Sequence, residues 1–408
     1  MTQRDVLIIG GGIFGSAIAW ALGRRGLGKR VLILEREQPA SGATSRAAAL
    51  VTMARDDPSL MALAGETFRA MAVLEGEYGE GIGRRTVGAL HVVPTSDGDA
   101  LKARVQHCAS YGIASQWVDK PEALARAPWL APQSFDLAAF YPDDCFVDPY
   151  LLSSAYLRTA LQMGAQLRLD SNVLTIMRHA GGVTGVKLTD GTLLPASIVI
   201  NAAGTWANLL SVGLGLPLPM APVRSQYWIT EPAPIFPRDG AIVLMPEIRA
   251  YARPEVGALL FGVREQQPAV VDPRQLPRDL AGFVFDSDDA DGWKNLAEGA
   301  ATLAPYFPAL NTLGMAHYIT GPSTYTPDGQ LIIGASRAFA GLFVATGCNG
   351  SGITFSGGVG RLVAELVCGE PAFVTPEVFD PERYGDFDPY AMAFLKSCAA
   401  ARAQKSAG

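Results

Sequence analysis

Three glycines near the start of the chain have the spacing of a turn that binds an anion. Gly10, Gly12 and Gly15 follow a short apolar run. In this pattern the first glycine permits a tight turn, the second lets backbone N–H groups approach a pyrophosphate, and the third lets a helix pack closely on a strand. Glu35 is placed to accept hydrogen bonds from a ribose 2′-OH and would repel a 2′-phosphate, so the pattern disfavours NADP.

The elements that would position these groups are a strand, a helix and a second strand. Residues 5–9 are predicted to form the first strand, an Ala-rich helix runs to Gly23, and residues 31–34 form the second strand before Glu35. The pyrophosphate would then lie at the helix N-terminus, where unpaired N–H groups and the helix dipole favour an anion. A glycine turn alone is also common in purely structural settings, but here all the elements agree on dinucleotide binding, with NAD or FAD left open.

A second glycine-rich turn lies far away in the sequence, at residues 347–352. It opens a predicted helix that continues through Leu366 and so gives a second helix N-terminus with exposed N–H groups. An NAD enzyme needs only one such turn, whereas a longer cofactor with a reducible ring needs two. The pair therefore indicates FAD.

Small and hydroxylated side chains add further contacts between residues 41 and 50, where the chain leaves the second strand. They let the backbone approach a flat ligand, although Ser41 or Thr44 could instead cap a helix. A buried strand at 197–201 also runs into small residues, which brings another segment towards the cofactor. The predicted cofactor-binding residues are Gly10, Gly12, Ile13, Phe14, Gly15, Glu35, Arg36, Ser41, Ala43, Thr44, Ser45, Ala48, Ala49, Leu50, Val173, Ala203, Gly204, Trp206, Gly347, Asn349, Gly350, Ser351, Gly352, Ile353 and Thr354.

Composition limits the class of protein. The 408 residues are 49% hydrophobic and 18% charged, with 44 glycines, which is typical of a loop-rich α/β enzyme of about two domains. The net charge of −6 argues against nucleic acid or an anionic membrane as a partner. No apolar run reaches the ~20 residues of a membrane helix, and the first strand begins too early for a signal peptide, so a cytoplasmic location is expected. Five scattered cysteines and four histidines suggest no metal site.

The predicted elements divide the chain into two interleaved domains. The expected fold is α/β, with a Rossmann-like FAD-binding domain of the glutathione-reductase type and a second, substrate domain built on a mixed or antiparallel sheet. The FAD-binding domain is assigned to 1–86, 145–216 and 319–375, and the substrate domain to 87–144 and 217–318. The remaining segment, 376–408, is expected to be a C-terminal tail.

These motifs together resemble the FAD-dependent D-amino-acid oxidase superfamily over nearly the full chain. The resemblance rests on residues 8–15, 41–44, 199–206, 326–329 and 347–352. Residues 251–262 and 307–329 look most like the flavin modules of dimethylglycine and sarcosine dehydrogenases, with glycine oxidase-like enzymes also similar. Such relatives usually continue into a folate-binding region, whereas this chain stops after the flavin module.

Departures from the family pattern carry information about attachment and electron acceptor. By the resemblance, Arg46 stands where dimethylglycine dehydrogenases attach FAD through a histidine, and Gly321 lies near the attaching cysteine of sarcosine oxidases, so FAD is expected to be noncovalent. Leu260 and Thr354 stand where those oxidases have active-site lysines. Without a cation near the flavin, reduced oxygen is less stabilised, which favours a dehydrogenase that passes electrons to a quinone or protein over an oxidase that uses O2. An arginine that glycine oxidases place before residues 327–329 is also absent, with Thr320 and Gly321 there instead.

Candidate substrate-binding residues lie on a strand predicted at 249–253. If the substrate is an amino acid, its carboxylate needs a cation, and Tyr251 and Arg253, two apart, would share one sheet face and grip it together. The alternative is an exposed face on which the arginine forms a salt bridge. The resemblance adds that Tyr251 matches a carboxylate-binding tyrosine of glycine oxidase-like enzymes and that Arg264 aligns with an active-site histidine. Arg264 and Arg46 are further candidates to bind the carboxylate or the flavin.

The expected activity is oxidation of the C–N bond of an amino acid or a secondary, N-methyl or cyclic, amine. Hydride would pass to flavin N5 and leave an imine that water hydrolyses. Two alternatives stay open: a 2-hydroxy-acid oxidoreductase on the same fold, and a flavoprotein subunit of a hetero-oligomeric amine dehydrogenase. The expected partners are a small-molecule substrate, an electron acceptor and further subunits in an oligomer.

Overall fold

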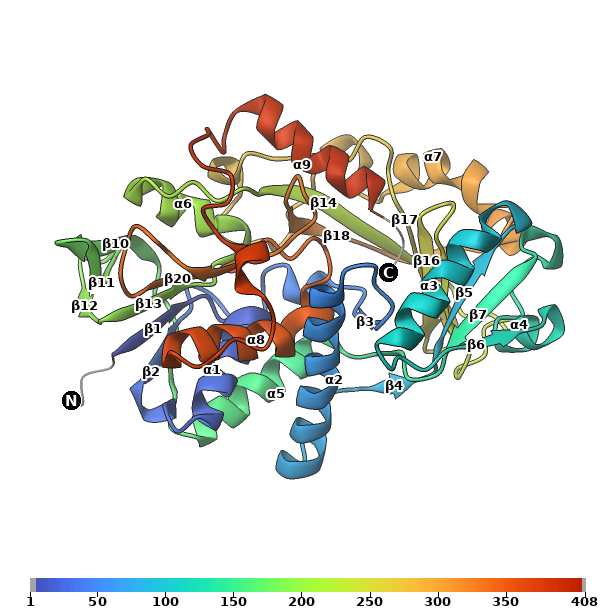
Figure 1. Ribbon diagram of the computed structural model, residues 1–408. Helices are drawn as coiled ribbons and strands as arrows, with labels where there is room; N and C mark the ends of the chain where they lie inside the picture. The colour runs from blue at the N-terminus through green and yellow to red at the C-terminus, as the bar shows by residue number, and fades with distance from the viewer. Residues whose placement is uncertain (1–4, 406–408) are drawn as a thin grey trace.

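Two large sheets organise the chain, and Figure 1 shows them side by side with the N-terminal segments in blue. This computed structural model describes residues 5–405. The first sheet has six strands in the order β19-β20-β13-β1-β2-β9, all parallel except that β19 runs antiparallel to β20. Its strands are β1 (Val6–Ile9), β2 (Val31–Leu34), β9 (Gln166–Arg168), β13 (Ile198–Asn201), β19 (Ile332–Ala335) and β20 (Leu342–Thr346).

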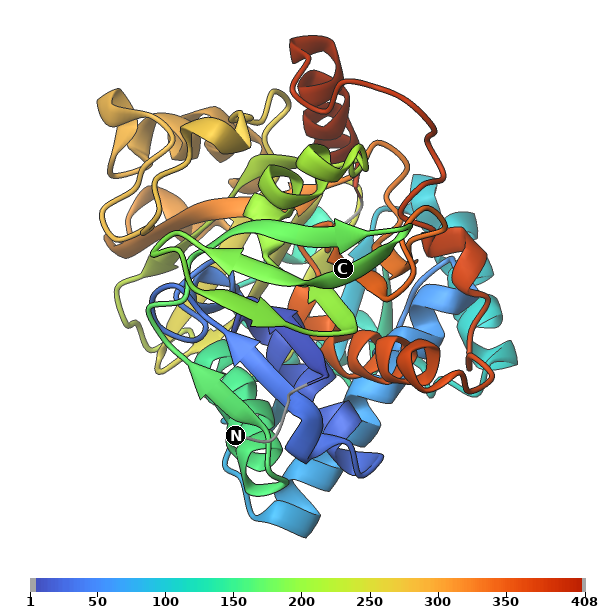
Figure 2. The same cartoon turned by 90° about the vertical axis from the view of Figure 1, so that its left-hand side faces the viewer.

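The buried strands of this sheet are covered on both faces. Alternate residues of β1 point to opposite sides, so Ile8 packs in a core with the helices and Leu7 packs in a separate core on the other face. The helices are α1 (Ile13–Arg24), α2 (Pro58–Tyr78), α5 (Pro149–Gln162) and α8 (Gly352–Cys368). The other face carries a three-stranded antiparallel sheet, seen in Figure 2, made of β10 (Val173–His179), β11 (Gly182–Leu188) and β12 (Leu193–Pro195).

The second large sheet has eight strands in the order β18-β14-β17-β16-β15-β5-β7-β6. The sheet is mixed, because β5 and β15 pair in parallel while all other neighbouring strands of the sheet are antiparallel. Its strands are β5 (Ala89–Val93), β6 (Gln116–Val118), β7 (Leu137–Tyr141), β14 (Ala221–Thr230), β15 (Ile242–Met245), β16 (Ala250–Glu255), β17 (Ala258–Val263) and β18 (Met315–Tyr325). This architecture confirms the expected α/β fold class.

One face of the mixed sheet buries an aromatic core that includes Trp228, Phe261 and Phe307. Helices α4 (Lys120–Arg126) and α7 (Trp293–Leu303) contribute to that core, and α3 (Gly98–Ser110) packs in a separate cluster with β5 and β7. A small sheet of β3 (Leu50–Val51), β8 (Cys145–Phe146) and β4 (Arg85–Thr86) lies where the chain passes between the two parts, and α6 (Ala207–Ser211) follows β13. None of the helices between residues 5 and 405 combines the length and apolar character needed to cross a membrane.

The segment expected to be a tail ends in a packed helix, α9 (Met392–Gln404). Leu395, Cys398 and Ala399 of α9 are buried against β14 and β18. In Figure 1 this helix, in red, lies over those two strands. The C-terminal segment is therefore part of the structure beside the mixed sheet.

Candidate cofactor and substrate site

A large cavity lies between the six-stranded sheet and the mixed sheet. It encloses about 2200 Å3 of empty space, including the part open to solvent. The first glycine turn, the 41–50 loop and the second glycine turn line it from one side, and strands of the mixed sheet line it from the other. Segments from both ends of the chain thus meet around one space.

The first glycine turn is built as the sequence predicts. Gly10 has φ +104°, and a Cβ there would lie 2.6 Å from the Ala202 carbonyl oxygen. A Cβ on Gly15 would lie 1.9 Å from the Gly10 carbonyl oxygen, so Gly15 allows α1 to pack on the strand although it does not line the cavity. Gly12 differs, because it is the extended N-cap of α1 and borders the cavity.

Glu35 closes the turn from the neighbouring strand. Its Oε2 accepts a hydrogen bond from Gly11 N at 2.7 Å, and its Oε1 accepts one from Glu37 N at 2.9 Å. An ionised carboxylate has about four lone-pair sites, so it keeps capacity for a ribose hydroxyl. Beside it, the Arg36 guanidinium lies 3.8 Å above the Trp206 ring, and both side chains line the cavity.

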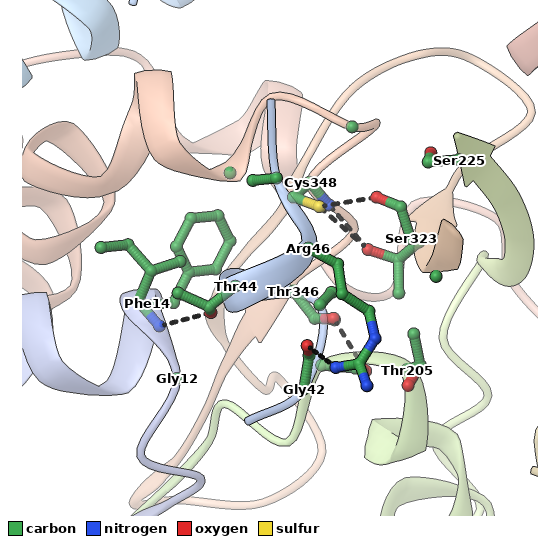
Figure 3. Close-up of a pocket in the computed structure, with 18 of the residues that line it drawn as sticks. Gly12, Phe14, Gly42, Thr44, Arg46, Thr205, Ser225, Ser323, Thr346 and Cys348 are labelled. Atoms are coloured by element: carbon green, nitrogen blue, oxygen red, sulfur yellow. Dashed lines mark hydrogen bonds between the residues drawn. The ribbon is translucent and has the colours of Figure 1, made fainter. Parts of the chain in front are cut away.

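The loop after β2 is held by side chains that act on backbone groups. Thr44 Oγ1 accepts a hydrogen bond from Ile13 N at 3.1 Å, so this threonine caps the distant helix α1 and not a helix of its own (Figure 3). Arg46 donates to the carbonyl oxygens of Ser41 at 2.6 Å, Gly42 at 2.9 Å and Leu280 at 2.8 Å. The last of these bonds ties the loop to the segment that follows β17.

The second glycine turn presents the N-terminus of α8 to the same cavity. Gly350 to Thr354 line it, and the N-cap Ser351 makes no side-chain hydrogen bond to the helix. Asn349 does not line the cavity but shapes the turn, because its Oδ1 accepts from Thr326 N at 2.9 Å and its Nδ2 donates to Gly347 O at 2.9 Å.

Most predicted cofactor-binding residues border the cavity. The exceptions are Gly15, Ser45, Gly347 and Asn349. Of these, Gly347 has φ +66°, and a Cβ there would lie 2.8 Å from Ile332 Cγ1. Gly15, Gly347 and Asn349 thus serve the shape of the two turns instead of facing the ligand space.

Tyr251 of the mixed sheet and Arg264, which directly follows β17, also line the cavity. Tyr251 lies on β16 directly across from Gly262, where a Cβ would come within 2.6 Å of the phenol ring, so the glycine makes room for it. Burial raises the pKa of Tyr251 to about 12, which keeps the phenol protonated near neutral pH and able to donate. Burial lowers the pKa of the Arg264 guanidinium from its usual value.

Arg253 does not join Tyr251 at the cavity, which corrects the expected pair. The strand runs from Ala250 to Glu255, and Arg249 occupies the preceding turn with φ +52°. Arg253 Nε donates to the Ala48 carbonyl oxygen at 2.8 Å, and its Nη1 pairs with Glu255 and bonds to Pro254 O. Its guanidinium thus positions the cofactor loop at Ala48 and does not line the cavity.

Four cavity cations were missed by motif reasoning: Arg55, Arg278, Arg402 and Lys405. Arg278 forms an ion pair with Glu37. Arg402 had a sequence signal, because Leu395, Cys398, Ala399 and Arg402 are spaced as one face of a helix. An arginine within such an apolar stripe points inward. Arg55 lies in the loop after β3, and no motif marks it or Lys405.

The polar groups that line the cavity suit the predicted FAD. The N-termini of α1 and α8 open into it at Gly12 and Ser351, and the side chain of Ser351 makes no hydrogen bond to its helix. Thr205 Oγ1 and Trp206 Nε1 are buried without a hydrogen-bond partner in the described residues, and both residues line the cavity. Such groups are expected where a polar ligand binds. Within residues 5–405, no group of three or more His, Cys, Asp or Glu side chains is arranged to hold a metal ion.

Comparisons with known proteins agree with this geometry. A family model described as FAD dependent oxidoreductase matches residues 5–366. Glycine oxidase of Geobacillus kaustophilus is 30% identical over 385 residues, which cover 90% of this chain and 94% of that protein. The solved structure of L-proline dehydrogenase from P. horikoshii superposes with a TM-score of 0.81 at 24% identity, covering 94% of this chain and 98% of that one.

A longer relative shows the same segment within a larger protein. Mitochondrial dimethylglycine dehydrogenase of Mus musculus is 29% identical over 394 residues, which cover 94% of this chain but 44% of the relative. The chain therefore spans less than half of that protein.

Proposed function

Because this chain belongs to the FAD dependent oxidoreductase family, we propose that it oxidises the C–N bond of an amino acid or a secondary amine. When bound, FAD would supply the acceptor for a hydride from the carbon next to nitrogen, and water would hydrolyse the resulting imine. The observation that carries the proposal is one cavity lined by both glycine-rich turns, by Tyr251 of the mixed sheet and by Arg264, which follows β17.

We assign the cavity residues to the cofactor or to the substrate according to where they lie. The turn at Gly10 to Phe14 and the acid Glu35 would hold the ADP half, and the N-terminus of α8 would face the flavin half. Tyr251, as a protonated phenol, would donate a hydrogen bond to the substrate.

We propose noncovalent attachment of FAD. Arg46 and Gly321 both line the cavity and lie against each other, with Arg46 Cδ 2.6 Å from the place of a Cβ on Gly321. Neither side chain can form a bond to the flavin. Among the cavity residues in the described part of the chain, Cys348 is the only histidine or cysteine, and its Sγ lies 3.4 Å from Thr324 Oγ1.

The side chains around the flavin position bear on the electron acceptor. Leu260 and Thr354 stand where related oxidases have lysines, which favoured a dehydrogenase. The cavity also contains Arg264, Arg402 and Lys405 from other elements, and such cations would stabilise reduced oxygen. Formation of H2O2 in air would identify an oxidase, and reduction of a quinone or protein acceptor alone would identify a dehydrogenase.

Anaerobic spectrophotometry tests the proposed function. The purified protein should show flavin absorbance that is bleached by at least one of sarcosine, N,N-dimethylglycine, proline or glycine. Bleaching by 2-hydroxy acids and by no amine would instead identify the hydroxy-acid alternative. Bleaching only after a partner subunit is added would identify a hetero-oligomeric flavoprotein, and protein that holds no flavin would refute the proposal.

A further inference from the structure

The last helix delivers a buried arginine to the substrate side of the cavity. Leu395, Cys398 and Ala399 fix α9 against β14 and β18, and one turn further Arg402 lies on the same helix face. Arg402 is 2% exposed and lines the cavity, and its guanidinium carbon lies 5.9 Å from the centre of the Tyr325 ring. It lies beside the mixed sheet that also carries Tyr251.

The charge of Arg402 is incompletely matched within the described residues. Its Nη2 lies 3.6 Å from Glu265 Oε2, beyond hydrogen-bond distance. Glu265 is already engaged through its other oxygen, which accepts hydrogen bonds from Arg224 Nε and Nη2. Nε and Nη1 of Arg402 have no hydrogen-bond partner. A buried guanidinium with two unused nitrogens is costly unless an anion completes it.

Arginines supply positive charge around the neighbouring Lys405. Lys405, one turn beyond Arg402, donates from Nζ to Asn349 O and to Ser351 Oγ, each at 2.6 Å, so these bonds connect α9 to the second glycine turn. Burial, with Arg264, Arg55 and Arg402 nearby, holds the pKa of Lys405 well below its usual range. The local field therefore favours an anionic ligand.

Three other arginines near the site are engaged by partners of their own. Arg253 bonds to Ala48 O and pairs with Glu255, Arg46 donates to three carbonyl oxygens, and Arg224 pairs with Glu265. Arg402 combines burial, a place in the cavity wall and two unused donors in a fork that suits a carboxylate.

We propose that Arg402 binds the carboxylate of the substrate, so that the enzyme acts on amines that carry a carboxylate. The inference rests on the proposed amine oxidation. It assigns substrate selection to a helix that lies outside the segment matched by the family model, residues 5–366.

The test compares Arg402→Gln with wild type in the flavin-loaded enzyme. Anaerobic bleaching is measured with sarcosine and with proline, each beside its amide, which keeps the amine and removes the charge. Wild type should discriminate strongly in favour of the acids. Arg402→Gln should raise the acid concentration for half-maximal bleaching about 10- to 100-fold, as expected for a lost charged hydrogen bond, and change the amide little.

Two variants and one further measurement separate binding from structure. Lys396→Gln removes a positive charge from the exposed face of the same helix and should leave every value unchanged. Arg402→Lys keeps the charge but loses the forked donor, so its acid concentration for half-maximal bleaching should lie between those of wild type and Arg402→Gln. If Arg402→Gln does not fold, the value for Arg402→Lys and the acid-to-amide ratio of wild type test the role of Arg402. The melting temperature of ligand-free Arg402→Gln should not fall, because Glu265 keeps Arg224, whereas a purely structural Arg402 would give a drop.

The outcomes that overturn the inference are distinct from those that overturn the proposed function. Unchanged acid binding in Arg402→Gln, equal bleaching of wild type by acids and amides, or loss of flavin from Arg402→Gln would each refute the role of Arg402 and leave amine oxidation standing. A wild-type enzyme that no amine bleaches would refute the proposed function, and the inference with it.

Discussion

A substitution at Gly12 should impair cofactor binding without impairing folding. Its φ of −74° and ψ of −175° suit any L-residue, and a Cβ there would lie 3.4 Å from Thr44 Oγ1, an ordinary contact. Gly10 and Gly15 differ, because a Cβ at either would come within 2.6 Å of a backbone oxygen. Gly12→Val should therefore fold, while Gly10→Val and Gly15→Val should not.

The expected loss concerns the pyrophosphate. The valine methyl groups would occupy the space in front of the α1 N-terminus, where N–H groups would meet the phosphate oxygens. Losing two charge-assisted hydrogen bonds costs ~3 kcal/mol or more, roughly a 100-fold or greater rise in the dissociation constant of FAD. The apoprotein should lose at most about 1 kcal/mol, the usual scale of a poor N-cap residue.

The assay is the flavin-to-protein ratio after gel filtration, with the melting temperature of the apoprotein measured alongside. Gly76→Val is the matched control, because Gly76 is exposed on α2 with no atom within 4 Å of its Cβ position. Gly12→Val that keeps stoichiometric flavin would refute the assignment of the first turn to the pyrophosphate. If Gly12→Val fails to fold, the prediction that this substitution affects cofactor binding alone is refuted.

Four other predictions test the site and its surroundings. Tyr251→Phe should raise the amino-acid concentration for half-maximal bleaching about tenfold with unchanged flavin content, since one hydrogen bond is lost; an unchanged value would remove the phenol from the site. Arg46→Met should lower flavin retention on dialysis, because it frees the carbonyls of the cofactor loop; full retention would show that the loop is held without Arg46. Acid precipitation should release all flavin to the supernatant, and flavin that stays in the pellet of wild type but not of Cys348→Ser would show a covalent bond. Burial lowers the pKa of His91 to about 3, so the unfolded chain takes up a proton below pH ~6.5 that the folded chain excludes, and stability falls as the pH drops. His91→Leu should reduce the loss of unfolding free energy between pH 7 and pH 5 by ~2 kcal/mol in denaturant titrations, and an unchanged pH dependence would contradict this.

The fold could be predicted from the sequence at positions where the residue type alone sets the local backbone. Gly10 and Gly15 leave no room for a Cβ, and Glu35 accepts a hydrogen bond from the turn, so these positions could be read directly from residue type. The strand predicted at 31–34 has the expected bounds, because it is a short, continuous apolar run.

The substrate side was less predictable because it depends on which way long side chains turn. Tyr251 and Arg253 are two apart on one strand, yet Arg253 reaches the carbonyl of Ala48, some 200 residues away in the chain. Strand periodicity gives the face of a side chain but not its partner. Arg402 is a similar case, since its role depends on how α9 docks against β14 and β18, and that docking is a tertiary contact.

The order of strands in the six-stranded sheet has a consequence for synthesis of the chain. β1 lies between β2 and β13, and Val6 pairs with Ile198, about 190 residues later. At ~5–20 residues per second, the ribosome needs on the order of 10–40 s to deliver that partner, and longer still to deliver β20. Until then the nascent chain exposes an unpaired apolar strand edge, so the early segment is expected to depend on chaperones, and FAD can enter a finished site only after most of the chain has emerged.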